Sequence, residues 1–254
     1  MGKNMNKLKH LIAVLLLAPA LALAAGTGVK LDHAPIDEND QASQQRGARH
    51  FVNYCLNCHS ASYMRFNRLR DIGLTDQQIL DNLVFTGVKV GDLMKVAMDP
   101  KDAKSWFGVA PPELSLIARS RASEAGSGAD WLYTYLRSFY RDAERPTGWN
   151  NTVFPNVGMP HVMWELQGEQ VMGEQKVQGA GFEKTEHVLK LDKPGKLSPV
   201  EYDRMVADLV NYLVFMAEPA RSSRTTIGMF VLLALSLLFI LAYALKKEYW
   251  KDVH

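Results

Sequence analysis

The stretch Cys55-Leu56-Asn57-Cys58-His59 constrains this chain more than any other. It holds the only two cysteines among 254 residues, and a histidine directly follows the second. Two thiols at this spacing lie about one helical turn apart, so each can add to one vinyl group of a haem. The next residue then faces the iron, where its imidazole can be the first axial ligand. The motif therefore predicts one haem c, attached through Cys55 and Cys58, with His59 on the iron.

Two other kinds of site also use a CxxC pair. A thioredoxin-like redox pair is expected to follow a strand and open a helix, whereas Cys55 comes late in a helical pattern. A zinc site needs about two further Cys or His ligands at compact spacing, and the sequence has no second cluster of these residues. Haem attachment is the favoured interpretation.

Composition excludes one class of partner. With 47% hydrophobic and 22% charged residues the chain is ordinary for a globular protein. Its formal net charge falls from +2 to −1 when Lys3, Lys7 and Lys9 of the predicted leader are left out. No basic excess remains that would indicate nucleic-acid binding.

Residues 1–25 have the three parts of a secretory signal peptide: lysines, an apolar run over 11–17 and small residues at 22–25. An uncleaved anchor is the alternative, but the apolar run is short and Pro19 interrupts it, so cleavage after Ala24 or Ala25 is favoured. Export places the body of the chain outside the cytosol. From what is known of c-type cytochromes, whose haem is attached on the outer side of the bacterial inner membrane, residues 26–220 are expected to form a periplasmic haem domain.

A second apolar segment lies near the C-terminus. Residues 227–245 contain no charge over 19 positions, and as a helix they would be about 28 Å long, close to the roughly 30 Å of a bilayer core. The segment has no polar face, which argues against a buried core helix. We expect a linker and transmembrane anchor over 221–245 and a cytoplasmic tail over 246–254. Basic residues on its two sides are nearly balanced, so the orientation rests on the signal peptide.

Helices are predicted through the haem domain. One begins near Asn39 or Asp40, both good N-caps, and runs into the cysteines. Gly47 within it indicates either a close helix crossing or a tolerated surface glycine. Capping-box patterns begin two further helices, one at 75–78 with 79, 80, 83 and 84 on its buried side, and one at 198–201. Residues 164–197 are polar and glycine-rich, which predicts a hairpin or a loop.

An aromatic stripe recurs at helical spacing in the stretch 129–140. Trp131, Tyr135 and Phe139 follow one another at i, i+4 and i+8, the spacing of one buried face. Core packing accounts for this stripe without any cofactor.

The residues alone do not decide which side chain is the second iron ligand. Met159 lies in a Gly/Pro-rich loop that can approach a flat macrocycle, and Met163 and His161 are the next candidates. Pro111 and Pro112 donate no backbone hydrogen bond, so their carbonyls suit the second nitrogen of a ligating histidine, although a plain turn also explains them.

Four segments together carry a resemblance to a known family: Cys-Leu-Asn-Cys-His-Ser at 55–60, Ala-Pro-Pro-Glu-Leu-Ser at 110–115, Val-Phe-Pro-Asn-Val-Gly-Met-Pro-His at 153–161, and Ala-Glu-Pro at 217–219. With the predicted export signal and C-terminal anchor, the chain resembles the cytochrome c1 family in its proteobacterial form. These proteins are the haem c subunits of the cytochrome bc1 complex (ubiquinol:cytochrome c oxidoreductase). The resemblance covers nearly the whole mature chain.

The resemblance implies a fold and a set of site residues. The fold would be mainly α, a class I cytochrome c-like domain with insertions, its N-terminal helix crossing the 198–217 helix, plus one C-terminal transmembrane helix. Cys55 and Cys58 would form the thioethers, and His59 and Met159 would be the two iron ligands. Arg119, in the helix after the proline motif, would face a haem propionate. Pro111 or Pro112 would supply the carbonyl partner of the histidine.

The resemblance also implies a function. The chain would relay single electrons from a Rieske iron–sulfur protein to a cytochrome c, beside cytochrome b in a dimeric complex of the bacterial inner membrane. Quinol oxidation would belong to the complex and not to this subunit. Two alternatives remain: a free-standing membrane-anchored cytochrome c that donates to a terminal oxidase, and a haem enzyme or sensor with an open coordination site.

Overall fold

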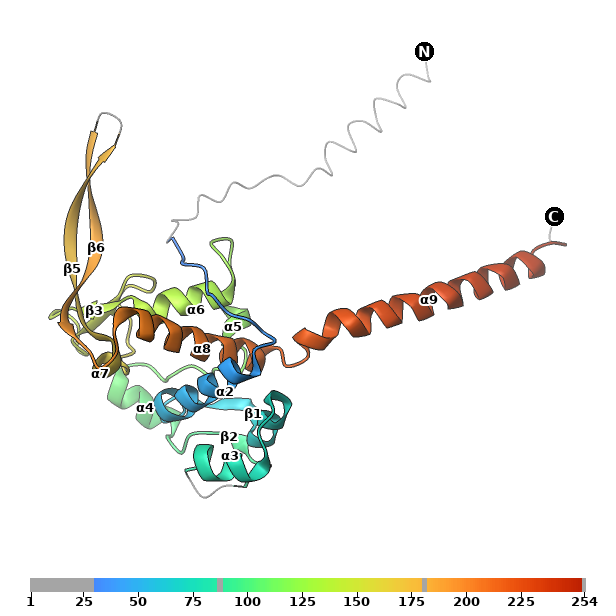
Figure 1. Ribbon diagram of the computed structural model, residues 1–254, viewed down its shortest axis with the longest axis horizontal. Helices are drawn as coiled ribbons and strands as arrows, with labels where there is room; N and C mark the ends of the chain where they lie inside the picture. The colour runs from blue at the N-terminus through green and yellow to red at the C-terminus, as the bar shows by residue number, and fades with distance from the viewer. Residues whose placement is uncertain (1–29, 86–88, 180–181, 253–254) are drawn as a thin grey trace, which may run out of the picture.

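The computed structural model describes residues 30–85, 89–179 and 182–252 (Figure 1). The predicted signal peptide lies outside the described residues. The helices are α2 (Gln41–His50), η1 (Phe51–Cys55, a π-helix), η2 (Phe66–Ile72, a 3-10 helix), α3 (Asp76–Leu83), α4 (Pro100–Phe107), α5 (Ile117–Ser120), α6 (Gly128–Arg137), α7 (Trp164–Gln167), α8 (Pro199–Ala217) and α9 (Arg221–Tyr249).

The strands form three separate antiparallel pairs in the described parts of the chain: β1 (Ala61–Arg65) with β2 (Leu93–Met94), β3 (Phe139–Arg141) with β4 (Trp149–Asn151), and β5 (Gly168–Gly179) with β6 (Phe182–Pro194). Helices dominate, as predicted. The strands of the first two pairs are only two to five residues long, and their short runs of alternating residues gave no strand prediction.

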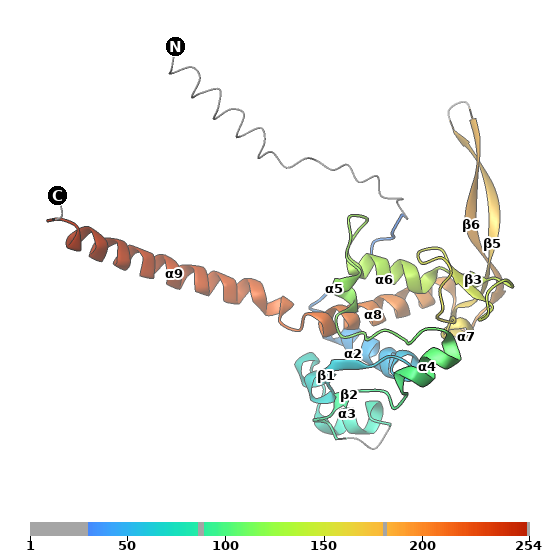
Figure 2. The same cartoon turned by 180° about the vertical axis from the view of Figure 1, so that it is seen from behind.

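Helices α2 and α8 cross at the centre of the domain (Figures 1 and 2). A Cβ added to Gly47 would lie 2.0 Å from the backbone oxygen of Asp208 and 2.7 Å from Cβ of Tyr212. Beside this contact, the rings of Phe51 and Tyr212 lie 5.5 Å apart, and Arg46 pairs with Asp208 at 2.6 Å. Gly47 therefore marks a close helix crossing, and the predicted crossing of the N-terminal helix with the 198–217 helix is confirmed.

The predicted helix starts are confirmed. The side chain of Asp40 caps α2, and capping boxes pair Thr75 with Gln78 at α3 and Ser198 with Glu201 at α8. The first helix continues toward the cysteines as the π-helix η1. On α3, Ile79 and Leu83 are buried, but Leu80 is 41% exposed, so the predicted buried face was too wide.

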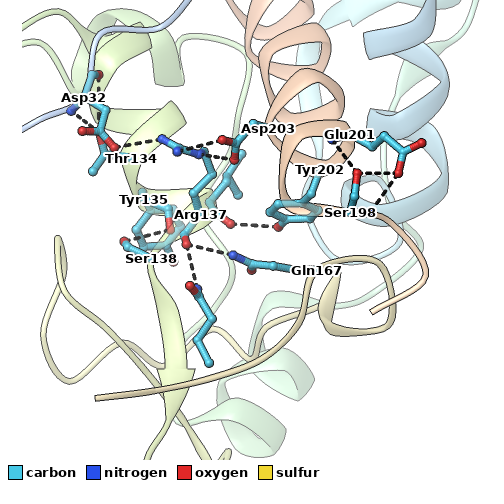
Figure 3. A network of polar contacts seen from close by, with 12 residues as sticks. Asp32, Thr134, Tyr135, Arg137, Ser138, Gln167, Ser198, Glu201, Tyr202 and Asp203 are labelled. Carbon is cyan, nitrogen blue, oxygen red and sulfur yellow. Dashed lines mark hydrogen bonds and ion pairs between the residues drawn. The ribbon is translucent and has the colours of Figure 1, made fainter. Parts of the chain in front are cut away.

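A polar network joins α6 to α8 and to the N-terminal lead-in (Figure 3). The guanidinium of Arg137 donates to both carboxylate oxygens of Asp203, at 2.6 and 3.0 Å, and to Asp32 at 2.8 Å. The buried hydroxyl of Tyr202 donates to the carbonyl of Leu136 at 2.9 Å. Because α6 and α8 both supply walls of the site described below, this network fixes their spacing.

Strands β5 and β6 form a hairpin that projects from the domain (Figure 1). The sequence predicted either a hairpin or a loop for this segment, and the hairpin is confirmed. Its base is tied to the domain: the amide of Gln170 donates to the carbonyls of Arg137 and Phe139, each at 2.9 Å.

Helix α9 extends away from the domain with its apolar side chains exposed (Figures 1 and 2). The stretch Ser223–Tyr249 is long and apolar enough to cross a membrane, and it contains the predicted span. At the N-terminal end of α9 (the root of α9 below), Arg221 pairs with Glu38 at 2.8 Å, and Arg224 pairs with Glu218. Ion pairs therefore hold this end of the helix to the domain.

Candidate functional site

A cavity of about 340 Å³ lies between the CxxCH turn, helices α6 and α8, the proline loop and the loop that carries Met159. Its lining is mostly apolar, with Leu132, Leu136, Leu209 and Leu213 from the two helices. Cys55, Cys58, His59 and Met159 all line it. The CxxCH motif and Met159, predicted from two distant parts of the sequence, therefore meet at one site.

Backbone hydrogen bonds stabilise the CxxCH turn. The amides of Cys58 and His59 both donate to the carbonyl of Cys55, at 3.1 and 2.9 Å. Both cysteines are free thiols. Burial, with a smaller effect of Cys58, raises the pKa of the Cys55 thiol to about 12, which makes it a poor thiolate at neutral pH and counts against a thioredoxin-like pair.

The zinc alternative also fails on geometry. The described ranges of the chain contain no group of three or more His, Cys, Asp or Glu side chains placed to hold a metal ion. A structural zinc site needs four such ligands around one point.

His59 is oriented by the proline loop. Its Nδ1 lies 2.7 Å from the carbonyl oxygen of Pro112, so Nδ1 carries the proton and Nε2 keeps a free lone pair. Burial lowers the pKa of His59, although the Pro112 carbonyl acts in the opposite direction, so the neutral form of the ring is favoured. Pro111 and Pro112 both line the cavity, but the hydrogen bond is made by Pro112.

The loop with Met159 is held by two asparagines of β4. The side-chain oxygen of Asn151 accepts from the amides of Val153 and Phe154, at 2.9 and 3.1 Å, and that of Asn150 accepts from the amide of Asn156 at 2.8 Å. Asn156 has φ 62°, a left-handed conformation that asparagine tolerates better than most residues. The loop therefore reaches the cavity in a defined conformation.

The other two candidate ligands lie outside the cavity. His161 is 2% exposed, stacked on Phe139 at 4.9 Å with an edge contact to Trp149 at 5.0 Å. Burial lowers its pKa to about 4, so it packs as a neutral aromatic ring. Met163 is 1% exposed within the core. Of the three candidates, Met159 alone lines the cavity.

The arginine that lines this cavity is Arg121 and not Arg119, the residue that the resemblance implies as propionate partner. The guanidinium of Arg121 lies over the rings of Trp131 and Phe154, at 4.5 and 5.6 Å, and its side chain lines the cavity. Ile117 and Arg121 are four residues apart and share one side of the helical turn, whereas Arg119 falls on another side. Arg119 lines a second cavity of about 550 Å³ near the root of α9.

The aromatic stripe of α6 also differs from its interpretation as core alone. Trp131 and Tyr135 of α6 line the cavity, whereas Phe139, the first residue of β3, packs against His161. The hydroxyl of Tyr135 donates to Sδ of Met159 at 3.4 Å. Burial raises the pKa of Tyr135, so the hydroxyl keeps its proton.

The residues present fit a haem. Two thiols, a neutral imidazole nitrogen and a thioether sulfur border one apolar cavity, and a cation lies at its aromatic side. This is the donor set of a c-type haem with histidine and methionine ligands. With the apolar helix α9, the fold and site define the class of membrane-anchored c-type cytochromes.

Comparison with known proteins narrows this class. The profile of the Cytochrome C1 family matches residues 32–178 and 195–253. A cytochrome c1 of Allochromatium vinosum is 52% identical, covering 96% of this chain and 98% of that protein. A protein of Nitrosomonas europaea named ammonia monooxygenase gamma subunit is 51% identical, covering 98% and 100%. A cytochrome c1 of Rhodospirillum rubrum is 25% identical, covering 84% and 83%.

The chain belongs to the cytochrome c1 family. Its members carry a covalently bound haem c, in agreement with the two cysteines that border the cavity.

Proposed function

We propose that this chain is the haem c subunit of a cytochrome bc1 complex and passes single electrons from a Rieske iron–sulfur protein to a cytochrome c. The carrying observation is that the CxxCH turn and Met159 border the same apolar cavity. The 52% identity to a cytochrome c1 over nearly the full chain supports the assignment to this complex.

Each site residue has a distinct task in this proposal. Cys55 and Cys58 would hold the haem through thioethers, and His59 Nε2 and Met159 Sδ would bind its iron. When bound, the haem supplies one-electron redox chemistry. The carbonyl of Pro112 keeps the proton on Nδ1 of His59, and the leucines of α6 and α8 exclude water from the cavity.

With both His59 and Met159 on the iron, no position would stay open for oxygen or peroxide, which favours electron transfer over a haem enzyme or sensor. A propionate beside a desolvated edge needs a charge-assisted partner. Because Arg121 lines the cavity, it would take this role in place of Arg119, which the resemblance implies.

The proposal also covers location and partners. The haem domain lies in the periplasm after removal of residues 1–25, helix α9 crosses the inner membrane once, and the C-terminus lies in the cytoplasm. Cytochrome b and the Rieske protein are neighbours in a dimeric complex. Support comes from the exposed apolar surface of α9 and its basic last turn with Lys246 and Lys247.

The relative from Nitrosomonas europaea raises association with an ammonia monooxygenase as a second candidate. Both candidates use the same haem site, so they differ in partners only.

Copurification distinguishes the candidates. Full-length tagged protein, extracted from membranes in mild detergent, is expected to bring down a cytochrome b and a Rieske protein, identified by optical spectra and mass spectrometry. A chain that purifies without a cytochrome b contradicts the proposal and favours a free-standing cytochrome. A chain that brings down monooxygenase subunits instead supports the second candidate.

A further inference from the structure

Met159 has a polar neighbour that its proposed role as a ligand does not require. The hydroxyl of Tyr135 donates a hydrogen bond to Sδ of Met159 at 3.4 Å. Within the described residues, that sulfur is the one hydrogen-bond acceptor of this hydroxyl. Tyr135 is only 8% exposed and lies on the wall of the cavity among leucines.

The Tyr135 ring is held between Trp131 of α6 and Phe139, the first residue of β3. Trp131, one turn earlier, stacks on it at 4.8 Å with planes 13° apart. Phe139, at the start of β3, makes an edge contact at 5.1 Å. Arg121 covers the Trp131 ring at 4.5 Å. Because the ring is held on both sides, the direction of the hydroxyl is set before any ligand binds.

A buried hydroxyl is costly without a partner, at about 1–3 kcal/mol. Phenylalanine at this position would keep the ring packing and avoid that cost. The hydroxyl is therefore explained by its contact with the sulfur and not by core packing.

A thioether sulfur has two lone pairs, so it can bind a metal with one and accept a hydrogen bond with the other. The hydrogen bond withdraws electron density from the sulfur, which weakens it as a donor to the more electron-poor, oxidised iron. Loss of donation destabilises the oxidised state relative to the reduced state.

We propose that Tyr135 is a positioning residue that orients the Met159 sulfur and raises the reduction potential of the site through this hydrogen bond. The inference rests on the proposed axial role of Met159. It adds a residue on α6 to those supplied by the CxxCH turn and the methionine loop.

The test is a redox titration of membrane-extracted holoprotein with Tyr135→Phe, which keeps the ring and removes only the hydroxyl. Tyr133→Phe is the matched control: it lies on the same helix, is 6% exposed, and its ring packs under Arg137 outside the cavity. Tyr135→Phe is expected to shift the equilibrium toward the oxidised form by roughly three- to tenfold, the size of one net hydrogen bond. That corresponds to about 30–60 mV lower potential at 59 mV per tenfold. Tyr133→Phe is expected to match the wild type.

The sulfur-to-iron absorption band separates two kinds of failure. If the wild type shows the band, Met159→Leu removes it, and Tyr135→Phe leaves the potential unchanged, the inference for Tyr135 is overturned while the proposed ligation stands. If Met159→Leu leaves the band in place, the ligation itself fails and the inference fails with it. A band that is weakened or lost in Tyr135→Phe but intact in Tyr133→Phe supports the positioning role.

Discussion

The carbonyl of Pro112 accepts a hydrogen bond from Nδ1 of His59 at 2.7 Å, across a sequence separation of 53 residues. Proline has no N–H, so the loop offers the imidazole an acceptor and no competing donor. The loop is held against the CxxCH turn by the amide of Leu114, which donates to the carbonyl of Ser60 at 2.9 Å. One backbone carbonyl thus decides which nitrogen of His59 is free to bind a metal.

The α2–α8 crossing depends on the absence of a side chain at Gly47. Gly47→Ala places a methyl group 2.0 Å from the backbone oxygen of Asp208. A backbone atom cannot avoid this clash by a side-chain rotation, so one of the two helices has to shift. We expect about 1–3 kcal/mol lower free energy of unfolding, the usual cost of overpacking, measured by denaturant titration.

Gly91→Ala is the matched control for that measurement, because nothing lies within 4 Å of the added methyl group. Its free energy of unfolding should stay within about 0.5 kcal/mol of the wild type, the range of ordinary surface changes. Equal stability of the Gly47 and Gly91 variants would refute the close crossing.

Arg121 lines the cavity, whereas the resemblance implies Arg119 as the propionate partner, and substitutions of the two residues distinguish these assignments. Removing a cation near the site stabilises the oxidised, more positive state. Arg121→Gln should therefore lower the midpoint potential, by an amount on the order of 1 kcal/mol for a charge effect in a partly screened setting. Arg119→Gln, in the second cavity, should leave it unchanged. The opposite pattern would restore the original prediction for Arg119.

Stability should fall at low pH through Asp130. Its carboxylate accepts hydrogen bonds from the amide of Ala34 at 2.8 Å and from the hydroxyl of Ser127 at 2.7 Å, and it lies 3.2 Å from His33. Burial alone would raise the pKa of Asp130, but the bonds from Ser127 and Ala34 lower it.

The pKa of Asp130 in the folded state lies below the unfolded value of about 3.9. The stabilisation that its carboxylate provides is therefore complete above about pH 3.9 and is lost as the pH falls through the folded pKa. Asp130→Asn should remove about 1 kcal/mol at neutral pH, the usual size of a capping interaction, and flatten that part of the curve. Unfolding measured from pH 6 to pH 2 tests this; an unchanged pH profile in the variant would exclude Asp130 as the source.

Local signals in the sequence predicted much of this molecule. Cys55, Cys58 and His59 are adjacent, so their spacing alone indicates haem attachment, and the side chains of Thr75 and Ser198 cap helices through contacts within four residues. Such features depend on few neighbours, and the predicted caps are present in the structure.

Features that depend on distant contacts were less predictable. Whether Gly47 is a crossing or a surface glycine is decided by α8, far along the chain. The stripe of Trp131 and Tyr135 looks the same whether it faces a core or a cofactor cavity. Arg119 and Arg121 cannot be separated without the phase of the four-residue helix α5. A signal for Arg121 did exist, since it follows the buried Ile117 by four residues.

The optical spectrum of membrane-extracted holoprotein tests the central claim most directly. Met159→Leu is compared with the wild type and with Met163→Leu, a control in which a buried methionine outside the cavity is changed. Histidine–methionine ligation predicts a sulfur-to-iron charge-transfer band in the oxidised wild type and in Met163→Leu, and its absence in Met159→Leu. A band that is missing in the wild type, or that survives in Met159→Leu, would contradict the account; binding of carbon monoxide by the reduced wild type would then point to an open coordination site.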